Sequence, residues 1–245
     1  MEKNSAVIVT GAGKGIGKDL VDRIIENGFF VYGIIKSKSD LKKFKNNSKC
    51  QIILGDIKND NILKKVLKIS IKQKRKVFGL VNNAGERQRI DFNKIKKKEI
   101  KQIFDVNFFS NFYNMQTFSK YLIQKKIQGS IVNIGSIVGP RGFSQLCGYA
   151  SSKSALEGLT KSFATEMAKF NIRANIIHPG FVKTSYYKKF RKNKKKIYNW
   201  TLSRIPQKKW GEPEDVSNLA CFLLSKKSRY ITGSSFNVDG GWLNS

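Results

Sequence analysis

Tyr149 and Lys153 stand four residues apart in a segment of helical periodicity, and Ser136 precedes them at the end of an apolar run. Side chains at this spacing project from one face of a helix. A free tyrosine titrates near pH ~10, so it exchanges protons poorly at neutral pH unless a cation lowers its pKa. Lys153 can supply that cation, and Ser136 can hydrogen-bond a carbonyl group. The trio predicts acid–base chemistry on a carbonyl or alcohol, although a Tyr–Lys pair alone is more typical of a solvated helix surface.

A glycine-rich turn follows the first expected strand and leads into an expected helix. It reads Thr10-Gly11-Ala12-Gly13-Lys14-Gly15-Ile16-Gly17. Glycines here let the backbone turn tightly and let a pyrophosphate approach the amides at the positive end of the helix. An ordinary strand-to-helix connection can also look like this. Because a second strand follows at the expected distance, we predict a dinucleotide site.

The end of the second expected strand indicates which dinucleotide binds. NAD sites place an acidic residue there to bind the ribose hydroxyls, whereas a 2′-phosphate requires that carboxylate to be absent and a cation to be near. This chain has Ile35 and Lys36 there, with Lys14 inside the glycine-rich turn. We therefore predict that NADP(H) is preferred over NAD(H), the alternative being that both lysines are ordinary solvated residues.

Short β-branched runs alternate with longer segments of helical periodicity. The expected strands span 6–9, 30–35, 51–54, 78–81, 130–134, 173–177 and 235–238. The expected helices span 17–27, 61–71, 97–125, 148–170 and 213–224. This alternation is typical of an α/β fold in which helices cover both faces of a doubly wound parallel sheet. No linker or repeat divides residues 1–245, so we expect one domain with about seven strands.

The segment around Asn107 is apolar on nearly every side. Its aromatic residues include Phe104, Phe108, Phe109 and Phe112. A helix of this kind is buried on more than one face. We expect the sheet to cover one face and a second copy of the chain to cover another.

Charge and composition disfavour several classes of protein. The chain carries 47 Lys and Arg against 17 Asp and Glu, a formal charge of +30. These residues are mostly scattered lysines with no recognised docking motif around them, which disfavours a nucleic-acid partner. One His and three separated cysteines suggest no metal site and fit a reducing cytoplasm. No apolar run approaches the roughly 20 residues that span a bilayer, so no membrane partner is expected.

Over essentially its whole length, the chain resembles the single-domain Rossmann form of the short-chain dehydrogenase/reductase (SDR) family. The matching pieces occur in the family's order and include the glycine-rich turn, Asp56-Ile57, Asn82-Asn83-Ala84-Gly85, Asn107, Ser136, Tyr149 with Lys153, Pro179-Gly180 with Thr184, Gly211 to Val216, Thr232-Gly233 and Asp239-Gly240-Gly241. Each piece is weak alone, and their joint order makes the resemblance specific. The 3-oxoacyl-ACP reductases are the subgroup that the chain looks most like.

The resemblance implies an enzyme that interconverts a ketone and a secondary alcohol. Tyr149 would be the general acid, Lys153 would lower its pKa and bind the nicotinamide ribose, Ser136 would hold the carbonyl, and Asn107 would hold a water that relays protons to Lys153. The cofactor would contact the glycine-rich turn and Ile35-Lys36. Its adenine would meet Asp56 and Ile57, and its channel would be lined by Asn83, Ala84 and Gly85. Its carboxamide and phosphates would be covered by Pro179, Gly180, Val182 and Thr184. Gly135, where many relatives have a second serine, would be a tolerated variation. A homotetramer or homodimer is also implied.

Residues 183–210 occupy the place of the family's mobile substrate lid, and here this segment is basic with aromatic residues between the lysines. It could close over an anionic substrate, such as an acyl-phosphopantetheine on an acidic carrier or a carboxylated sugar, or it could be solvated without a specific role. The candidate substrate contacts are Arg141, Leu146 and Tyr186.

We thus expect a small-molecule or carrier-bound carbonyl substrate. A 3-oxoacyl-ACP reductase-like activity comes first, and a sugar, polyol or hydroxy-acid dehydrogenase of the same family is the alternative. A rival of another class is a non-catalytic dinucleotide-binding sensor, because fold does not fix function. The joint presence of Asn107, Ser136, Tyr149 and Lys153 favours the enzyme.

Overall fold

A parallel sheet of seven strands forms the centre of the computed structural model, which describes residues 4–44 and 47–245, with the side chains of residues 185, 186, 188 and 189 left out. The strands are β1 (Ser5–Thr10), β2 (Phe30–Ile35), β3 (Cys50–Leu54), β4 (Lys76–Asn82), β5 (Gly129–Ile134), β6 (Ile172–Pro179) and β7 (Ser235–Val238). Their order across the sheet is β3-β2-β1-β4-β5-β6-β7. The predicted fold class is confirmed, and each expected strand exists within two residues of its predicted ends.

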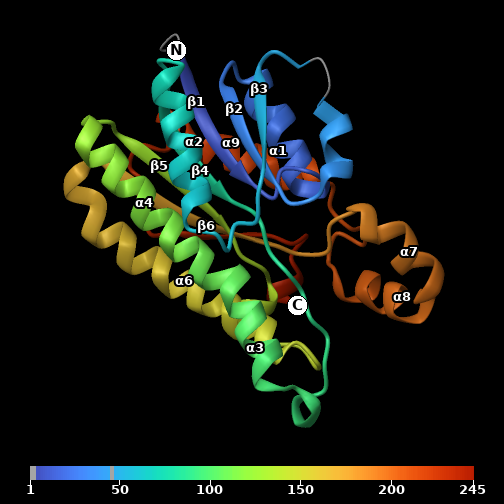
Figure 1. Cartoon of the computed structure of the whole chain (residues 1–245). Coiled ribbons are helices and arrows are strands. Elements are labelled where there is room, and N and C mark those ends of the chain that lie inside the picture. The colour runs from blue at the N-terminus through green and yellow to red at the C-terminus, as the bar shows by residue number, and fades with distance from the viewer. Residues whose placement is uncertain (1–3, 45–46) are drawn as a thin grey trace.

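Helices cover both faces of the sheet (Figure 1). α1 (Gly15–Glu26) and α9 (Pro213–Leu224) pack together on one face. α2 (Asn61–Lys72), α4 (Ser110–Lys125) and α6 (Cys147–Met167) cover the other, where α4 and α6 run side by side. The shorter helices are α3 (Lys97–Phe104), α5 (Val138–Arg141), α7 (Ser185–Asn193) and α8 (Lys195–Arg204). No helix in the described part of the chain is both long and apolar enough to cross a bilayer.

The two hydrophobic cores explain why the strands are apolar throughout. Along β1, Ala6 and Ile8 face the core under α2, α4 and α6, while Val7 and Val9 face the core under α1 and α9. Successive side chains of a strand point to opposite faces, so a strand covered on both sides needs an apolar residue at every position. These buried strands hold the loops at their carboxyl ends in fixed positions.

The helix predicted over 97–125 is interrupted at Asn107. α3 ends at Phe104, a π-helical turn spans Asp105–Phe109, and α4 begins at Ser110. Ser110 Oγ and Asn111 Nδ2 donate hydrogen bonds to the carbonyl oxygens of Val106 and Asn107 at 2.6 and 2.7 Å. Such side-chain donors compete with the regular backbone ladder, and π-turns of this kind are frequent at functional sites. The prediction of one regular helix was therefore wrong here, because apolar periodicity does not register the change.

The segment 183–210 contains α7 and α8, two helices that the periodicity analysis did not predict. In Figure 1 they form a pair that stands on the opposite side of the molecule from α4 and α6. α7 is rich in basic residues and α8 mixes basic, polar and aromatic ones, so the apolar pattern that reveals a core helix is weak in this segment.

Candidate functional site

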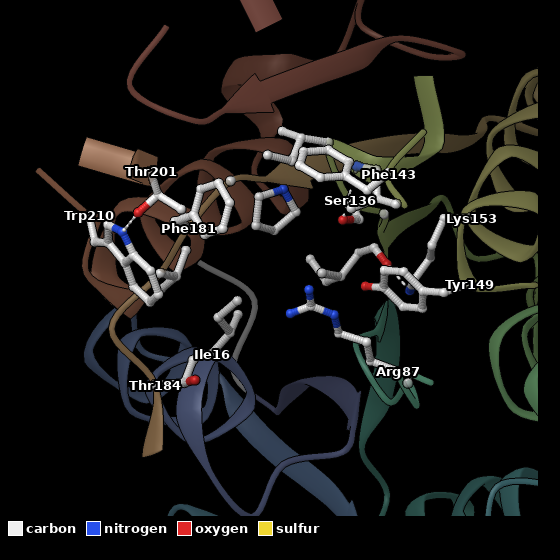
Figure 2. Close-up of a pocket in the computed structure, with 18 of the residues that line it drawn as sticks. Ile16, Arg87, Ser136, Phe143, Tyr149, Lys153, Phe181, Thr184, Thr201 and Trp210 are labelled. Atoms are coloured by element: carbon white, nitrogen blue, oxygen red, sulfur yellow. Dashed lines mark hydrogen bonds between the residues drawn. The ribbon is translucent and has the colours of Figure 1, made fainter. Parts of the chain in front are cut away.

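A cavity of about 300 Å³ lies at the carboxyl ends of the strands (Figure 2). Ligands of open α/β sheets bind at this edge, next to the point where the strand order reverses. Ser136, Tyr149 and Lys153 line one end of the cavity, and Ile16 and Thr184 line another. Its wall also contains the predicted cofactor residues Asn83, Gly85, Pro179, Gly180 and Val182. The structure thus gathers residues from six distant parts of the sequence around one space.

Tyr149 and Ser136 face the same part of the cavity (Figure 2). Burial raises the pKa of Tyr149 above its ordinary value, while a hydrogen bond with Ser136 and the positive charge of Arg87 oppose that rise. The expectation that Lys153 lowers this pKa is not met, because burial penalises the tyrosinate anion more than its neighbours stabilise it. Tyr149 is therefore held in its protonated form.

Lys153 is buried, and its ammonium group is directed to the backbone. Its Nζ donates a hydrogen bond to the Ile134 carbonyl oxygen at 2.7 Å and lies 6.0 Å from the centre of the Tyr149 ring. Burial lowers the pKa of Lys153 from 10.5 to about 8. A lysine with this pKa can exchange a proton close to neutral pH.

Asn107 positions the loop that follows β4. Its Oδ1 accepts a hydrogen bond from the Glu86 amide at 2.8 Å, and its Nδ2 donates to the Glu86 carbonyl at 2.9 Å and to Ser152 Oγ at 3.0 Å. Gly85 fits between Asn107 and Lys153, since a Cβ there would lie 3.2 Å from Asn107 Oδ1 and 3.5 Å from Lys153 Nζ. The side chain of Asn107 thus fastens the loop that follows β4 to Ser152 of α6, one residue before Lys153.

The glycine-rich turn is bound tightly to the end of β4. Thr10 Oγ1 accepts hydrogen bonds from the Asn83 and Ala84 amides at 3.0 and 3.1 Å, and Asn83 Nδ2 donates to the carbonyl oxygens of Thr10 and Gly11. Gly11 has a φ of +64°, and a Cβ on it would lie 2.8 Å from Ala84 Cα. The turn and the Asn83 loop are therefore packed so closely that a side chain at position 11 would not fit between them, which accounts for the glycine there.

Of the residues predicted to contact the adenosine part of the cofactor, some lie on the surface and others in the core. Lys36 is exposed and forms an ion pair with Asp56 at 3.0 Å. Lys14, within the glycine-rich turn, is also exposed. The side chains of Ile35 and Ile57 are buried in the two cores, so neither faces a ligand. Near Gly13, Asp40 and Lys43 approach the turn, and Lys43 Nζ donates to the Gly13 carbonyl at 2.8 Å.

Two of the three predicted substrate contacts, Arg141 and Leu146, are not among the described residues that line the cavity. Arg141 donates hydrogen bonds to the Trp242 and Ser245 carbonyl oxygens at 3.4 and 3.1 Å, so it secures the last residues of the chain. Leu146 is buried in a small core with Trp210 and Trp242, away from the cavity wall. Neither residue is among the described residues that line the cavity, because nearness in sequence to Ser136 and Tyr149 does not fix side-chain direction. The side chain of Tyr186 lies outside the described part of the structure.

The aromatic residues of segment 183–210 mainly pack on one another. Tyr187, Phe190 and Tyr198 surround Trp210 at ring-centre distances of 5.2 to 5.5 Å, and Trp210 Nε1 donates to Thr201 Oγ1 at 2.8 Å. Phe190, Ile197, Trp200, Thr201 and Trp210 line the cavity. The exposed lysines at 192 and 194–196 lie outside this wall.

Arg87 and Arg89 are charged cavity residues that sequence reasoning missed. Their position just after Asn82-Asn83-Ala84-Gly85, in a loop at the carboxyl end of a central strand, is a signal that could have identified them.

Comparisons with known proteins agree with this geometry. Residues 11–243 match the family described as Enoyl-(Acyl carrier protein) reductase. The chain is 34% identical over 236 residues to the 3-oxoacyl-[acyl-carrier-protein] reductase FabG of Buchnera aphidicola subsp. Acyrthosiphon pisum, and the match covers 95% of each chain. It is 31% identical over 244 residues to the 2-dehydro-3-deoxy-D-gluconate 5-dehydrogenase of Dickeya dadantii, covering 98% of this chain and 96% of that one.

Solved structures with the same fold contain nicotinamide cofactors. 4-Hydroxyisoleucine dehydrogenase complexed with NADH is 30% identical with a TM-score of 0.92, and the match covers 99% of this chain and 100% of that one. ElxO with NADP bound is 26% identical with a TM-score of 0.91, and the match covers all of both chains. From the matched motifs and these relatives, the chain belongs to the short-chain dehydrogenase/reductase family of NAD(P)-dependent oxidoreductases.

Proposed function

We propose that this enzyme interconverts a ketone and a secondary alcohol, with Tyr149 as general acid in reduction and general base in oxidation. The observation that carries the proposal is that Ser136, Tyr149 and Lys153 meet in one cavity that extends to the glycine-rich turn. A dinucleotide-binding sensor would need the turn but not the buried lysine beside the tyrosine, since burying a lysine costs stability.

The residues of the cavity have complementary roles in proton transfer. In reduction, the Tyr149 hydroxyl donates its proton to the carbonyl oxygen, which becomes the alcohol oxygen. Ser136 hydrogen-bonds the same oxygen and stabilises the charge that develops on it. Tyr149 is protonated at neutral pH, as an acid in reduction must be, and the Lys153 ammonium, whose pKa burial lowers to about 8, would return a proton toward it.

The glycine-rich turn lies at the N-terminus of α1, which suits a dinucleotide. The backbone amides from Gly11 to Gly17 would hold its phosphates. Asn83 and Gly85 would line its path, and Pro179, Gly180, Val182 and Thr184 would cover its nicotinamide end. When bound, the cofactor supplies the hydride in reduction and accepts it in oxidation.

NADP(H) is the proposed preference over NAD(H). The support is the exposed Lys36 at the end of β2, the exposed Lys14 in the turn, and the absence of a carboxylate at Ile35. Lys36 also pairs with Asp56 at 3.0 Å, so a 2′-phosphate that binds this exposed lysine would have to share it with that carboxylate or displace it. Two partly solvated lysines are expected to favour NADP by about 10- to 100-fold.

Two substrate classes have support. The Buchnera relative is named for a 3-oxoacyl group on a carrier protein, and segment 183–210 is basic enough to attract such an acidic carrier. The Dickeya relative and the similar NADH complex are named for a gluconate and a hydroxy amino acid, which both carry carboxylates.

A cofactor-consumption assay tests the proposed function. The purified enzyme is mixed with NADPH and, in separate reactions, acetoacetyl thioesters, keto-sugar acids and small ketones. Tyr149→Phe removes the general acid and is expected to lower kcat by about 10²- to 10⁴-fold with every substrate that the wild type reduces. Tyr230→Phe is the matched control, since Tyr230 is fully exposed. Equal kcat values for wild type and Tyr149→Phe would reject the role of Tyr149, and NADPH binding without turnover of any compound would favour the sensor.

A further inference from the structure

Arg87 and Arg89 place positive charge in the cavity that holds Tyr149. Both line it, and both follow β4 in the loop that begins at Asn83. In Figure 2 the guanidinium group of Arg87 points into the cavity toward the Tyr149 hydroxyl, with Ser136 across the space from it. The positive charge of Arg87 is close enough to the Tyr149 hydroxyl to act on it, since it opposes the rise in the pKa of Tyr149. The proposed proton-transfer chemistry uses neither arginine.

Positive side chains outnumber acidic ones among the described residues that line the cavity. Glu86 is the one acidic residue among the described cavity residues, and its Oε2 accepts a hydrogen bond from Gln102 Nε2 at 3.1 Å. Asn107 fixes the backbone of Glu86 from the same side. Lys153 adds further positive charge, although its Nζ is directed to Ile134. The excess of positive charge therefore belongs to the cavity and is independent of the exposed lysines on α7 and α8.

Much of the rest of the cavity wall is aromatic. The cavity surfaces contributed by Phe143, Phe181, Trp200 and Trp210 are aromatic. Arg87 and Arg89 are themselves exposed, so water partly screens their charge and their binding of an anion depends on direct hydrogen bonds. A planar guanidinium also presents two parallel N–H groups that match the two oxygens of a carboxylate.

We propose that Arg87 and Arg89 bind a carboxylate of the substrate, so that the substrate is a small keto acid or hydroxy acid whose reacting carbon lies beside Tyr149 and Ser136. This assignment rests on the proposed function, which it deepens by naming the substrate class. Arg87 is the group nearer the chemistry and orients the acid. Arg89, farther along the same loop, adds attraction at the cavity wall.

Matched acids and amides test the carboxylate site. Reduction by NADPH is measured for 2-, 3-, 4- and 5-oxo carboxylates and for the amides of the same carbon chains, which lack the charge. A neutral acetoacetyl thioester of N-acetylcysteamine and dihydroxyacetone phosphate are included as a neutral and a phosphate-bearing ketone. For the best acid, kcat/KM should exceed that of its amide by about 10- to 100-fold, as a charge-assisted bidentate hydrogen bond predicts.

Arginine variants then assign the effect to the proposed residues. Arg87→Gln and Arg89→Gln should each lower kcat/KM for the acid by about 10-fold or more while leaving that of the amide within about two-fold. Arg229→Gln is the matched control, because Arg229 is exposed near the start of β6 and β7, at the opposite edge of the sheet. Thermal melting and NADPH binding of each variant show that it is folded and loaded with cofactor.

The outcomes separate the two proposals. Loss of all activity in Tyr149→Phe, together with equal effects of Arg87→Gln on acid and amide, would overturn the carboxylate site and leave the proposed function standing. A neutral thioester or a phosphate ester reduced better than every acid would also overturn it. Retained activity in Tyr149→Phe would instead reject the proposed function.

Discussion

Gly135 and His178 are in such close contact that a Cβ atom on Gly135 would lie 2.5 Å from Nδ1 of His178. That nitrogen lies 3.2 Å from the Ser136 amide and 3.0 Å from the Ser136 carbonyl oxygen, while Nε2 lies 3.3 Å from Glu157 Oε2. Burial lowers the pKa of His178, so the ring is neutral at physiological pH. His178 therefore supports the backbone of Ser136, and it can do so only because residue 135 has no side chain.

Gly135→Ser should be costly in this chain, although many relatives of the resembled family have a serine at this position. The new side chain must displace His178, and overpacking of this kind typically costs about 1–3 kcal/mol. We expect a lower free energy of unfolding in urea and a lower kcat, because Ser136 moves with the ring. His178→Ala should cost less in the Gly135→Ser background than in wild type. Additive effects of the two substitutions would show that the contact is unimportant.

Lys153 should make stability depend on pH in an unusual direction. Its pKa is about 8 in the folded chain and 10.5 when free, so between these values the unfolded chain binds more protons than the folded chain. Stability contributed by this group therefore rises as pH increases from about 8 to about 10.5, by up to about 3 kcal/mol. The difference in unfolding free energy between wild type and Lys153→Met, measured by urea denaturation at several pH values, should follow this rise. If the difference in unfolding free energy stays constant over that pH range, burial does not lower the pKa of Lys153.

Lys36→Gln should reduce the use of NADPH selectively. A partly solvated lysine contributes about 3- to 10-fold in kcat/KM toward a phosphate. The value for NADH should hardly change, because NADH lacks the 2′-phosphate. Lys38→Gln, at a nearby exposed position, is the control. An equal loss with both cofactors would remove the charge argument for NADP.

The lysines of α8 should act at long range if they attract the substrate. Replacing Lys194, Lys195 and Lys196 with Gln should lower kcat/KM for an anionic substrate at low salt without changing kcat. Raising ionic strength from 0.01 to 0.15 M shortens the screening length from about 30 to about 8 Å and should produce the same loss in wild type. A triple variant that matches wild type at every salt concentration would mean that these lysines only solvate the surface.

An apolar face on and beside α4 predicts self-association. Phe109, Phe112 and Tyr113 are 43%, 37% and 41% exposed there, although large aromatic patches are uncommon on monomers. Light scattering should give two or four times the chain mass of 27.8 kDa. Phe112→Glu should shift the protein toward smaller species. A monomeric wild type at micromolar concentration would refute the prediction.

The strands, the main helices and the grouping of Ser136, Tyr149 and Lys153 in one cavity could be predicted from sequence because they depend on local rules. β1 is apolar at Ala6 to Val9 since both of its faces are covered, and Tyr149 and Lys153 share a helix face through their spacing. The ordered motifs, from Thr10 to Asp239, likewise appear in the sequence itself. Local patterns thus determined the fold class and the chemistry of the three residues that we expect to react.

Only the tertiary structure decided where the loop side chains point. Arg141 binds the carbonyl oxygens of Trp242 and Ser245, and Ile57 turns into the core, while Arg87 turns into the cavity. These directions depend on partners far away in the sequence, which periodicity cannot register. The same holds for pKa values, since the depth of Tyr149 and Lys153 below the surface shifts them in opposite directions. Burial and long-range contact, which exist only after folding, therefore determined the electrostatics of this site.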